Sequence, residues 1–322
     1  MAANSFLTTI VIFLLILCPD AGRTASVRKG ADGTVTVAMI TWRGDTLAES
    51  GFVDGLNGYG YDVHFKKYPV NQDLNLLAAA IVALQKDPVD LIYIFGTTAT
   101  KQVLSQIRET PVVFNIVTRP VESGIINTWE SSGNNATGVS SMVPIRHQLE
   151  ALRKIIRFTR LGIIYNPLEQ NSIIQRYLTA RLADRFHFSL HEYRISGETD
   201  IPRLLANLDT EVDAVFLPSD SLIRTLGSTI MPLINARKVP SLSAIEDTVE
   251  KDAALIGLVP DYYELGRLAA NKAHLILQGQ DPSDIPSSPL DHFNIIVNMT
   301  TAREIGIDIP TSILIMADTI IR

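Results

Sequence analysis

Short apolar segments alternate with longer amphipathic segments along most of the chain, in two successive series. The first series has strand-like segments at 34–40, 62–70, 89–96 and 110–117, separated by segments with apolar residues at helical spacing. This alternation is interrupted around 134–144, and a second series of strand-like and helix-like segments follows. Alternating strands and helices predict an α/β fold with parallel sheets and helices on both faces. Because the series occurs twice, we expect two similar lobes.

Each predicted strand ends in a polar segment, such as GTTAT, YNPLEQNS or SAIED. In open α/β sheets, ligands bind beyond the carboxyl ends of the strands, where loops and helix N-termini gather. If two lobes turn these ends toward each other, the polar segments line a cleft between them. The candidate ligand-binding residues at these ends are Trp42, Thr97, Thr98, Thr118, Ser141, Asn166, Glu169, Ser172, Asp220 and Glu246.

Several of these residues have a second reading that is purely structural. Trp42 either packs locally in its loop or stacks on a ligand. Asp220 precedes a helical segment, where it caps the helix, contacts a ligand or does both. Asn166 and Ser172 carry the same ambiguity, and Glu169 either faces the start of the next helix or supplies a charge to the cleft. The sequence leaves these alternatives open.

The chain lacks the motifs of several enzyme classes. No GxGxxG follows the first strand, and neither GxxxxGK[ST] nor Gly-x-Ser-x-Gly occurs. From Val27 onward there is no cysteine, which excludes thiolate catalysis, disulfides and cysteine-rich metal sites there. His187 and His191 are spaced like two metal ligands on a helix, but their segment alternates like a strand. We therefore expect no catalytic residue, no metal and no cofactor.

The N-terminus carries a targeting segment. Phe6 to Leu17 is a nearly all-apolar run of about 12 residues, shorter than the ~20 residues of a membrane span. Its length fits the core of an export signal, although no Lys or Arg precedes it. We interpret residues 1–26 as an export signal. A lipid anchor on Cys18, despite the unfavourable Leu17 before it, and a retained anchor are the other readings.

Several motifs, taken together, resemble one family. They include IFGTTATKQVL at 94–104, LGIIYNPLEQNS at 161–172, VDAVFLPSDS at 212–221 and DYYELGRLAANKAHLILQGQDPSDIP at 261–286. This set is similar to the substrate-binding proteins of ABC transporters, in the branch that includes tryptophan- and phenylalanine-binding members. The likeness covers roughly residues 34–310.

The resemblance implies a type I periplasmic binding fold, in which two doubly wound parallel-sheet lobes are joined by three hinge crossings. Lobe one is then expected to comprise 34–140 plus 260–287, and lobe two 141–259 plus 288–322. The hinge crossings are expected near Gly138–Ser141, Leu258–Asp261 and Ser287–His292.

The sequence departs from the family pattern at two loops that would face the cleft. Arg119 stands before Pro120 where the family usually has aspartate, and the loop TWRGDTLAES contains Arg43. A guanidinium binds a carboxylate through two parallel hydrogen bonds. Both arginines are therefore candidate ligand-binding residues, and pairing with Asp45 or Glu122 is the alternative.

The resemblance implies a periplasmic or secreted protein that closes on a small carboxylate-bearing solute, an amino acid or aromatic acid, and delivers it to an ABC permease in the membrane. We expect a monomer, and the net charge of -6 argues against nucleic acid as a partner. Two alternatives remain at this point. The chain is a ligand-sensing module for a signalling partner, or a hydrolase or lyase on the same scaffold.

Overall fold

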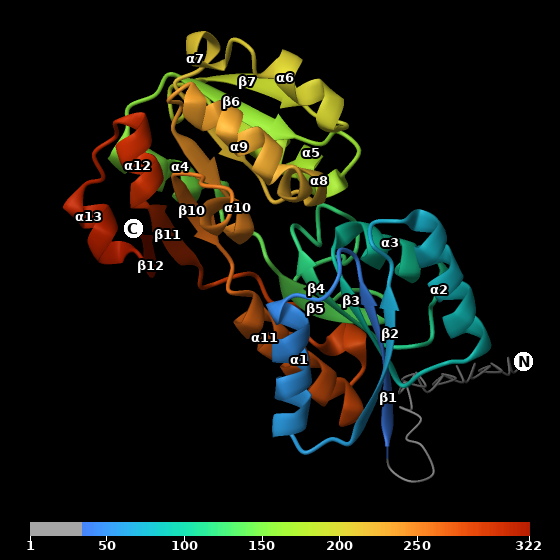
Figure 1. The fold of residues 1–322 in the computed structure, drawn as a ribbon. Coiled ribbons are helices and arrows are strands. Elements are labelled where there is room, and N and C mark those ends of the chain that lie inside the picture. The colour runs from blue at the N-terminus through green and yellow to red at the C-terminus, as the bar shows by residue number, and fades with distance from the viewer. Residues whose placement is uncertain (1–33) are drawn as a thin grey trace, which may run out of the picture.

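The computed structural model describes residues 34–322, so the expected export signal and Cys18 lie outside the described residues. The described chain forms two lobes, each built around its own sheet (Figure 1). This confirms the predicted α/β fold with parallel-sheet lobes. None of the helices in residues 34–322 has the length and hydrophobicity that a bilayer crossing requires.

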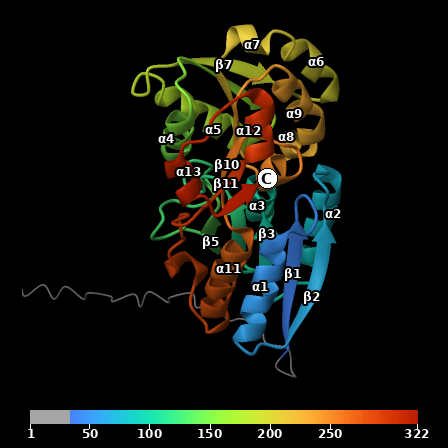
Figure 2. The ribbon, with the colours of Figure 1, turned by 60° about the vertical axis from the view of Figure 1, so that its left-hand side comes forward.

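The first lobe contains a five-stranded parallel sheet in the order β2-β1-β3-β4-β5. Its strands are β1 (Val35–Thr41), β2 (Val63–Pro69), β3 (Leu91–Phe95), β4 (Val112–Val117) and β5 (Ala136–Ser140). Its helices are α1 (Leu47–Gly58), α2 (Leu74–Lys86), α3 (Thr97–Gln106) and α11 (Tyr262–Leu277). Although α11 comes late in the sequence, it packs along α1 (Figure 2).

The second lobe contains a seven-stranded sheet in the order β12-β11-β10-β9-β8-β6-β7. Its strands are β6 (Arg160–Tyr165), β7 (Ser189–Arg194), β8 (Ala214–Leu217), β9 (Ser241–Ser243), β10 (Ile256–Val259), β11 (Asn294–Asn298) and β12 (Thr319–Ile321). Its helices are α4 (Ile145–Ile155), α5 (Gln170–Arg181), α6 (Ile201–Leu204), α7 (Leu208–Glu211), α8 (Ser221–Thr225), α9 (Gly227–Ala236), α10 (Glu246–Glu250), α12 (Met299–Ile305) and α13 (Thr311–Met316).

The chain passes between the lobes three times, from β5 to α4, from β10 to α11 and from α11 to β11. The first and third passages lie side by side, since Ser140 N–H donates to Ser288 O and Ser288 N–H donates to Gly138 O, both at 2.9 Å. The lobe boundaries and hinge positions given above stay predictions. Each lobe also has its own apolar core: one cluster runs from Val35 to Val139 and from Leu265 to Ile285, and separate clusters fill the second lobe. The described chain therefore has two lobes with separate cores, joined by three passages.

The structure differs from the sequence interpretation in a few elements. The pause around 134–144 contains strand β5, and the segment after β11 contains α12, α13 and β12. Two short helices, α6 and α7, lie between β7 and β8, and two more, α8 and α9, lie between β8 and β9. Strand β11 pairs antiparallel with β10, because β10 ends at the hinge and β11 begins there. His191 lies on strand β7, as its alternating segment predicted.

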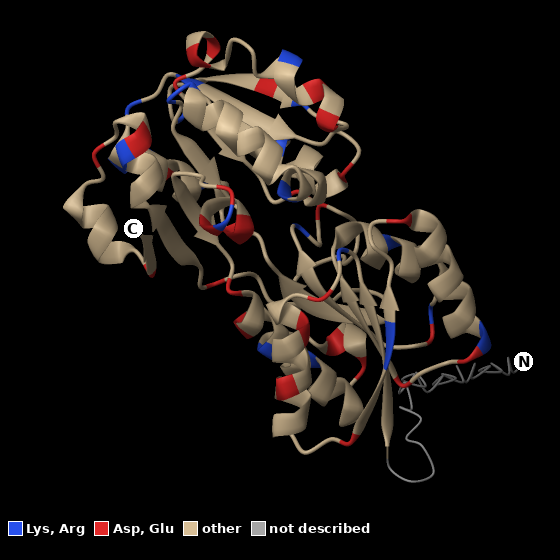
Figure 3. Cartoon of the chain, in the orientation of Figure 1, with Lys and Arg blue, Asp and Glu red and all other residues tan. Residues whose placement is uncertain are grey.

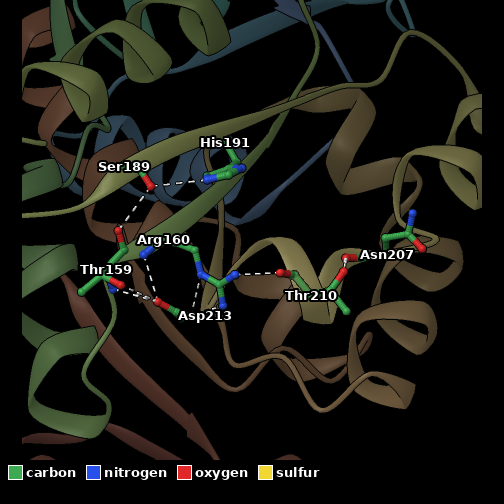
Figure 4. Close-up of polar contacts among 7 residues, drawn as sticks. All are labelled: Thr159, Arg160, Ser189, His191, Asn207, Thr210 and Asp213. Atoms are coloured by element: carbon green, nitrogen blue, oxygen red, sulfur yellow. Dashed lines mark hydrogen bonds and ion pairs between the residues drawn. The ribbon is translucent and has the colours of Figure 1, made fainter.

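Asp213 ties the start of β6 to the loop before β8, on the second lobe (Figure 4). Its carboxylate accepts hydrogen bonds from the backbone N–H groups of Thr159 and Arg160, at 2.8 and 2.9 Å, and from the Arg160 guanidinium at 2.7 Å. Burial opposes ionisation of this carboxyl group, but the hydrogen bonds outweigh burial and lower the pKa of Asp213 to about 2.

We expect Asp213→Asn to lower the free energy of unfolding by about 1–2 kcal/mol near pH 7, because an amide cannot replace all of these acceptor contacts at a partly exposed site. The folded-state pKa of about 2 lies below the ~3.9 of an unfolded aspartate, so the contribution is complete above about pH 4 and is lost as pH falls toward 2. Urea unfolding at several pH values measures the difference. Asp308→Asn, at an exposed position, is the control, and an equal loss in both variants would contradict the assignment.

Candidate ligand-binding cleft

Two adjoining hollows lie between the lobes, and Arg43 lines both. The narrow hollow, about 20 Å³ or room for one water molecule, is lined by Trp42, Arg43, Phe95, Gly96, Thr97, Thr98, Ile116 and Thr118 of lobe one and by Glu169, Asn171, Ser219, Asp220 and Ser221 of lobe two. The wide hollow, about 400 Å³, is lined by Arg43, Asp45, Thr46, Leu47 and Tyr262 on one side and by Arg224, Ile245, Glu246, Asp247, Glu250 and Lys251 on the other. Strand ends of both lobes thus meet across a cleft.

The lobe-one wall of the narrow hollow is the start of helix α3. Gly96, with φ of +89°, makes the turn from β3 into the helix, and a side chain there would meet Trp42. The first amide groups of a helix have no acceptor within it, and Gly96 offers no side-chain cap to them. The hydroxyl groups of Thr97 and Thr118 are beside this turn, where Thr97 Oγ1 accepts from Thr118 N–H at 3.5 Å. This wall presents hydrogen-bond donors and the positive end of a helix dipole.

Arg43 lies between aromatic rings at the junction of the two hollows. Its guanidinium carbon is 5.0 Å from the Phe95 ring centre and 5.5 Å from that of Tyr262, and one amino group donates to the Tyr262 hydroxyl. Within residues 34–322 the guanidinium has no carboxylate partner. Asp45, the partner suggested by the sequence, pairs instead with Lys67 at 2.6 Å. Its Nε is buried and has no hydrogen-bond partner among the described residues. The guanidinium therefore keeps donors for an anionic ligand.

The lobe-two wall carries two buried carboxyl groups at the start of α8. Asp220 caps the helix by accepting from Ile223 N–H at 2.9 Å, and Glu169 accepts from Ser221 N–H at 3.0 Å. Burial raises the pKa of Glu169, and the charge of Asp220 raises it further. Burial also raises the pKa of Asp220, despite its hydrogen bonds. A cationic group would stabilise the ionised forms of these two buried, neighbouring carboxyl groups.

Glu246 begins α10 and lines the wide hollow (Figure 3 shows the acidic residues of α10). Burial raises the pKa of Glu246, and the charges of Glu250 and Asp247 add to the effect. Asp247 itself is neutralised by ion pairs with Arg224 and, at 2.6 Å, with Lys251.

Four predicted residues line neither hollow. Arg119 forms an ion pair with Glu122, which was the alternative given for it. Ser172 donates to Asp220, and the Asn166 side chain accepts from Leu168 N–H at 2.9 Å. The Ser141 side chain is buried at the hinge passage. Ligand contact by these four and by the other candidates stays a prediction.

The sequence interpretation missed several lining residues. Phe95 and Tyr262 are aromatic residues at strand ends, and the same argument that selected Trp42 applies to both. Ile116 has no such signal. Its φ is +54°, which is rare for a β-branched residue, and the pairing of β4 with β5 shifts register at this point. The irregular backbone brings Ile116 into the narrow hollow.

Comparison with known proteins supplies the family. The model of the ABC transporter substrate binding protein family matches residues 35–321. The chain belongs to this family. Its family and its two-lobed fold are those of substrate-binding proteins, which are not enzymes.

The individual relatives share less than a third of their aligned residues with this chain. This substrate-binding protein is 28% identical over 262 residues to the tyrosine-binding protein of Clostridioides difficile, covering 80% of the chain and 75% of the relative. A solved Streptococcus pneumonia ABC domain in complex with L-Trp has a TM-score of 0.84 at 23% identity, over 89% of this chain and 100% of that one. The ligand-free, open structure of a substrate-binding protein with adhesive properties from Clostridium difficile has a TM-score of 0.72 at 23% identity, over 89% and 99%.

Proposed function

We propose that this protein is the extracytoplasmic solute-binding component of an ABC importer and that its solute is a zwitterionic α-amino acid, with an aromatic amino acid as the first candidate. The observation that carries the proposal is the pair of opposed walls. The Arg43 guanidinium, which has no carboxylate partner within residues 34–322, and the start of α3 face two buried carboxyl groups across the narrow hollow.

The carboxylate of the solute would bind the lobe-one wall. Arg43 offers free N–H donors, and the first turn of α3 adds backbone N–H groups at Thr97 and Thr98. The threonine hydroxyls supply further donors without adding charge.

The ammonium group of the solute would bind the lobe-two wall, at Glu169 and Asp220. Both carboxyl groups are already oriented by backbone N–H groups at the start of α8, so little freedom is lost when a ligand binds. The cation also replaces the solvation that these buried acids lack.

Three aromatic rings supply apolar surface around these polar groups: Trp42, Phe95 and Tyr262. The wide hollow adjoins them and has room for a side chain. The names of the relatives support an amino-acid solute, since one is a tyrosine-binding protein and another was solved with L-Trp.

The narrow hollow is too small for an amino acid as it stands, so we infer that the lobes separate to admit the solute and then close on it. Lys101 of α3 donates to Gln170 of α5 at 2.7 Å, so the two lobes touch at the rim of the cleft. A solute that contacts both walls binds the closed form better than the open one, and only that difference drives closure. The closed form then docks on a membrane permease.

A thermal-shift panel of the 20 common amino acids, aromatic acids and small carboxylates tests the proposal. We expect an aromatic amino acid to raise the melting temperature, because binding to the folded state alone stabilises it. The solute should be recovered unchanged by mass spectrometry after incubation. Conversion of the solute would support the hydrolase or lyase alternative, and stabilisation by none of these compounds would contradict the proposal.

Affinity for the amino acid should decrease as pH falls below neutrality. The ammonium group binds ionised carboxylates, and protons compete for Glu169 and Asp220, whose pKa values burial raises. The effect on stability has the opposite sign. Without solute, the raised pKa values favour folding at low pH, and that contribution is lost as pH rises through them.

Isothermal titration at several pH values measures the affinity. An amino acid amide, which keeps the ammonium group, should show the same dependence, and an affinity that does not change with pH would contradict the ammonium position.

A further inference from the structure

We propose that the second lobe carries another ligand site, an apolar groove between α4 and α13, which binds an amphiphilic monocarboxylate. Such a ligand has an apolar body and one carboxylate. The groove is lined by His147, Glu150, Ala151, Arg153, Lys154, Leu258, Phe293, Ile295, Ile313 and Met316. It shares no lining residue with either hollow of the cleft.

The floor of the groove is apolar and formed by strands. Leu258 of β10 and Ile295 of β11 are paired across the two strands, and Ile313 of α13 is completely buried beside them. The volume of about 520 Å³ is within the range of roughly 300–1,000 Å³ that small-molecule sites occupy. On α13, the lining residue Met316 is 49% exposed. An apolar ligand body would cover surface that water now reaches.

The rim of the groove carries the ammonium group of Lys154, which has no ion-pair partner within residues 34–322. The Lys154 ammonium is exposed, and its one recorded hydrogen-bond partner is the Met316 sulfur at 3.7 Å. Arg153 lies over the Phe158 ring and donates to the carbonyl oxygens of Phe158, at 3.3 Å, and of Phe186, so its guanidinium is already engaged by groups outside the groove lining. The acid of the groove, Glu150, already pairs with Arg146 at 2.7 Å. A carboxylate at this rim would be the first partner of the Lys154 charge.

The charges favour a small anionic ligand over a second copy of the chain. A twofold interface centred on this groove would bury the Lys154 ammonium group of both copies, while Glu150, the acid among the lining residues, is already paired with Arg146. The occupant that fits both the floor and the rim is therefore a monocarboxylate with an apolar chain or ring system.

Decanoate is the test ligand, titrated calorimetrically below its micelle concentration, with decanol as the uncharged analogue. We expect saturable binding of one decanoate per chain. Lys154→Met should weaken decanoate binding about fivefold while decanol binding changes less than about twofold. Met316→Ser should weaken both ligands about fivefold, because it removes part of the apolar wall. Both residues are exposed, so both variants should fold.

Lys86→Met, which removes an exposed lysine on α2 of the other lobe, is the matched control and should leave decanoate binding unchanged. The proposal is overturned by non-saturable binding, by equal losses in Lys154→Met and Lys86→Met, or by sedimentation that shows a dimer which decanoate does not dissociate. The thermal-shift panel of amino acids is a separate experiment. Failure of decanoate to bind would not contradict the proposed function of the cleft, and failure of the panel would not contradict the groove site.

Discussion

Replacing Gly266 by alanine should lower the free energy of unfolding by about 3 kcal/mol, although alanine favours helices more than glycine does. A Cβ at Gly266 would lie 2.1 Å from the backbone oxygen of Ala48 and 2.8 Å from the amide nitrogen of Phe52. A Cβ at Gly51 would meet Tyr263 O equally closely. Helices α1 and α11 therefore touch backbone to backbone, and the new methyl group must push them apart.

Gly58→Ala is the matched control for this prediction. Gly58 is the last residue of α1, and nothing lies within 4 Å of a Cβ built there. The same substitution should therefore raise stability by about 0.5–1 kcal/mol. Urea and thermal unfolding followed by circular dichroism measure both variants. A neutral Gly266→Ala would mean that α11 does not pack on α1 as described.

Arg43→Met should weaken binding of the amino-acid solute about 100-fold, because it removes the charge-assisted partner of the ligand carboxylate and keeps a long apolar side chain. Arg43 is not part of an ion pair within the described chain, so the melting temperature without ligand should change little. Isothermal titration with the solute identified in the panel measures the loss.

Arg119→Met provides the comparison, since Arg119 is the second arginine on a loop after a strand but pairs with Glu122. We expect less than a twofold change in affinity for this variant. Equal effects of the two substitutions would place both arginines on the ligand. An Arg43→Met variant with normal affinity would show that the carboxylate is held elsewhere.

The sequence predicted the parts of the cleft that depend on local pattern. Trp42, Thr97, Thr98, Thr118, Glu169 and Asp220 follow strands directly, and parallel strands bring their carboxyl ends to one edge. The spacing of residues along the chain could not show that Asp220 lines the cleft and that Ser172 does not. In the structure the Ser172 hydroxyl donates a hydrogen bond to the Asp220 carboxylate, and Ser172 lines neither hollow.

The sequence by itself determined the alternation of strands and helices, the two lobes and the polar strand ends, because each depends on residues close together along the chain. Only the tertiary structure decided which arginine pairs with a carboxylate within residues 34–322, which carboxyl groups share a wall and where Ile116 and Tyr262 lie. Those facts depend on contacts between distant segments, such as Arg43 with Tyr262, and no local pattern encodes the distance between them.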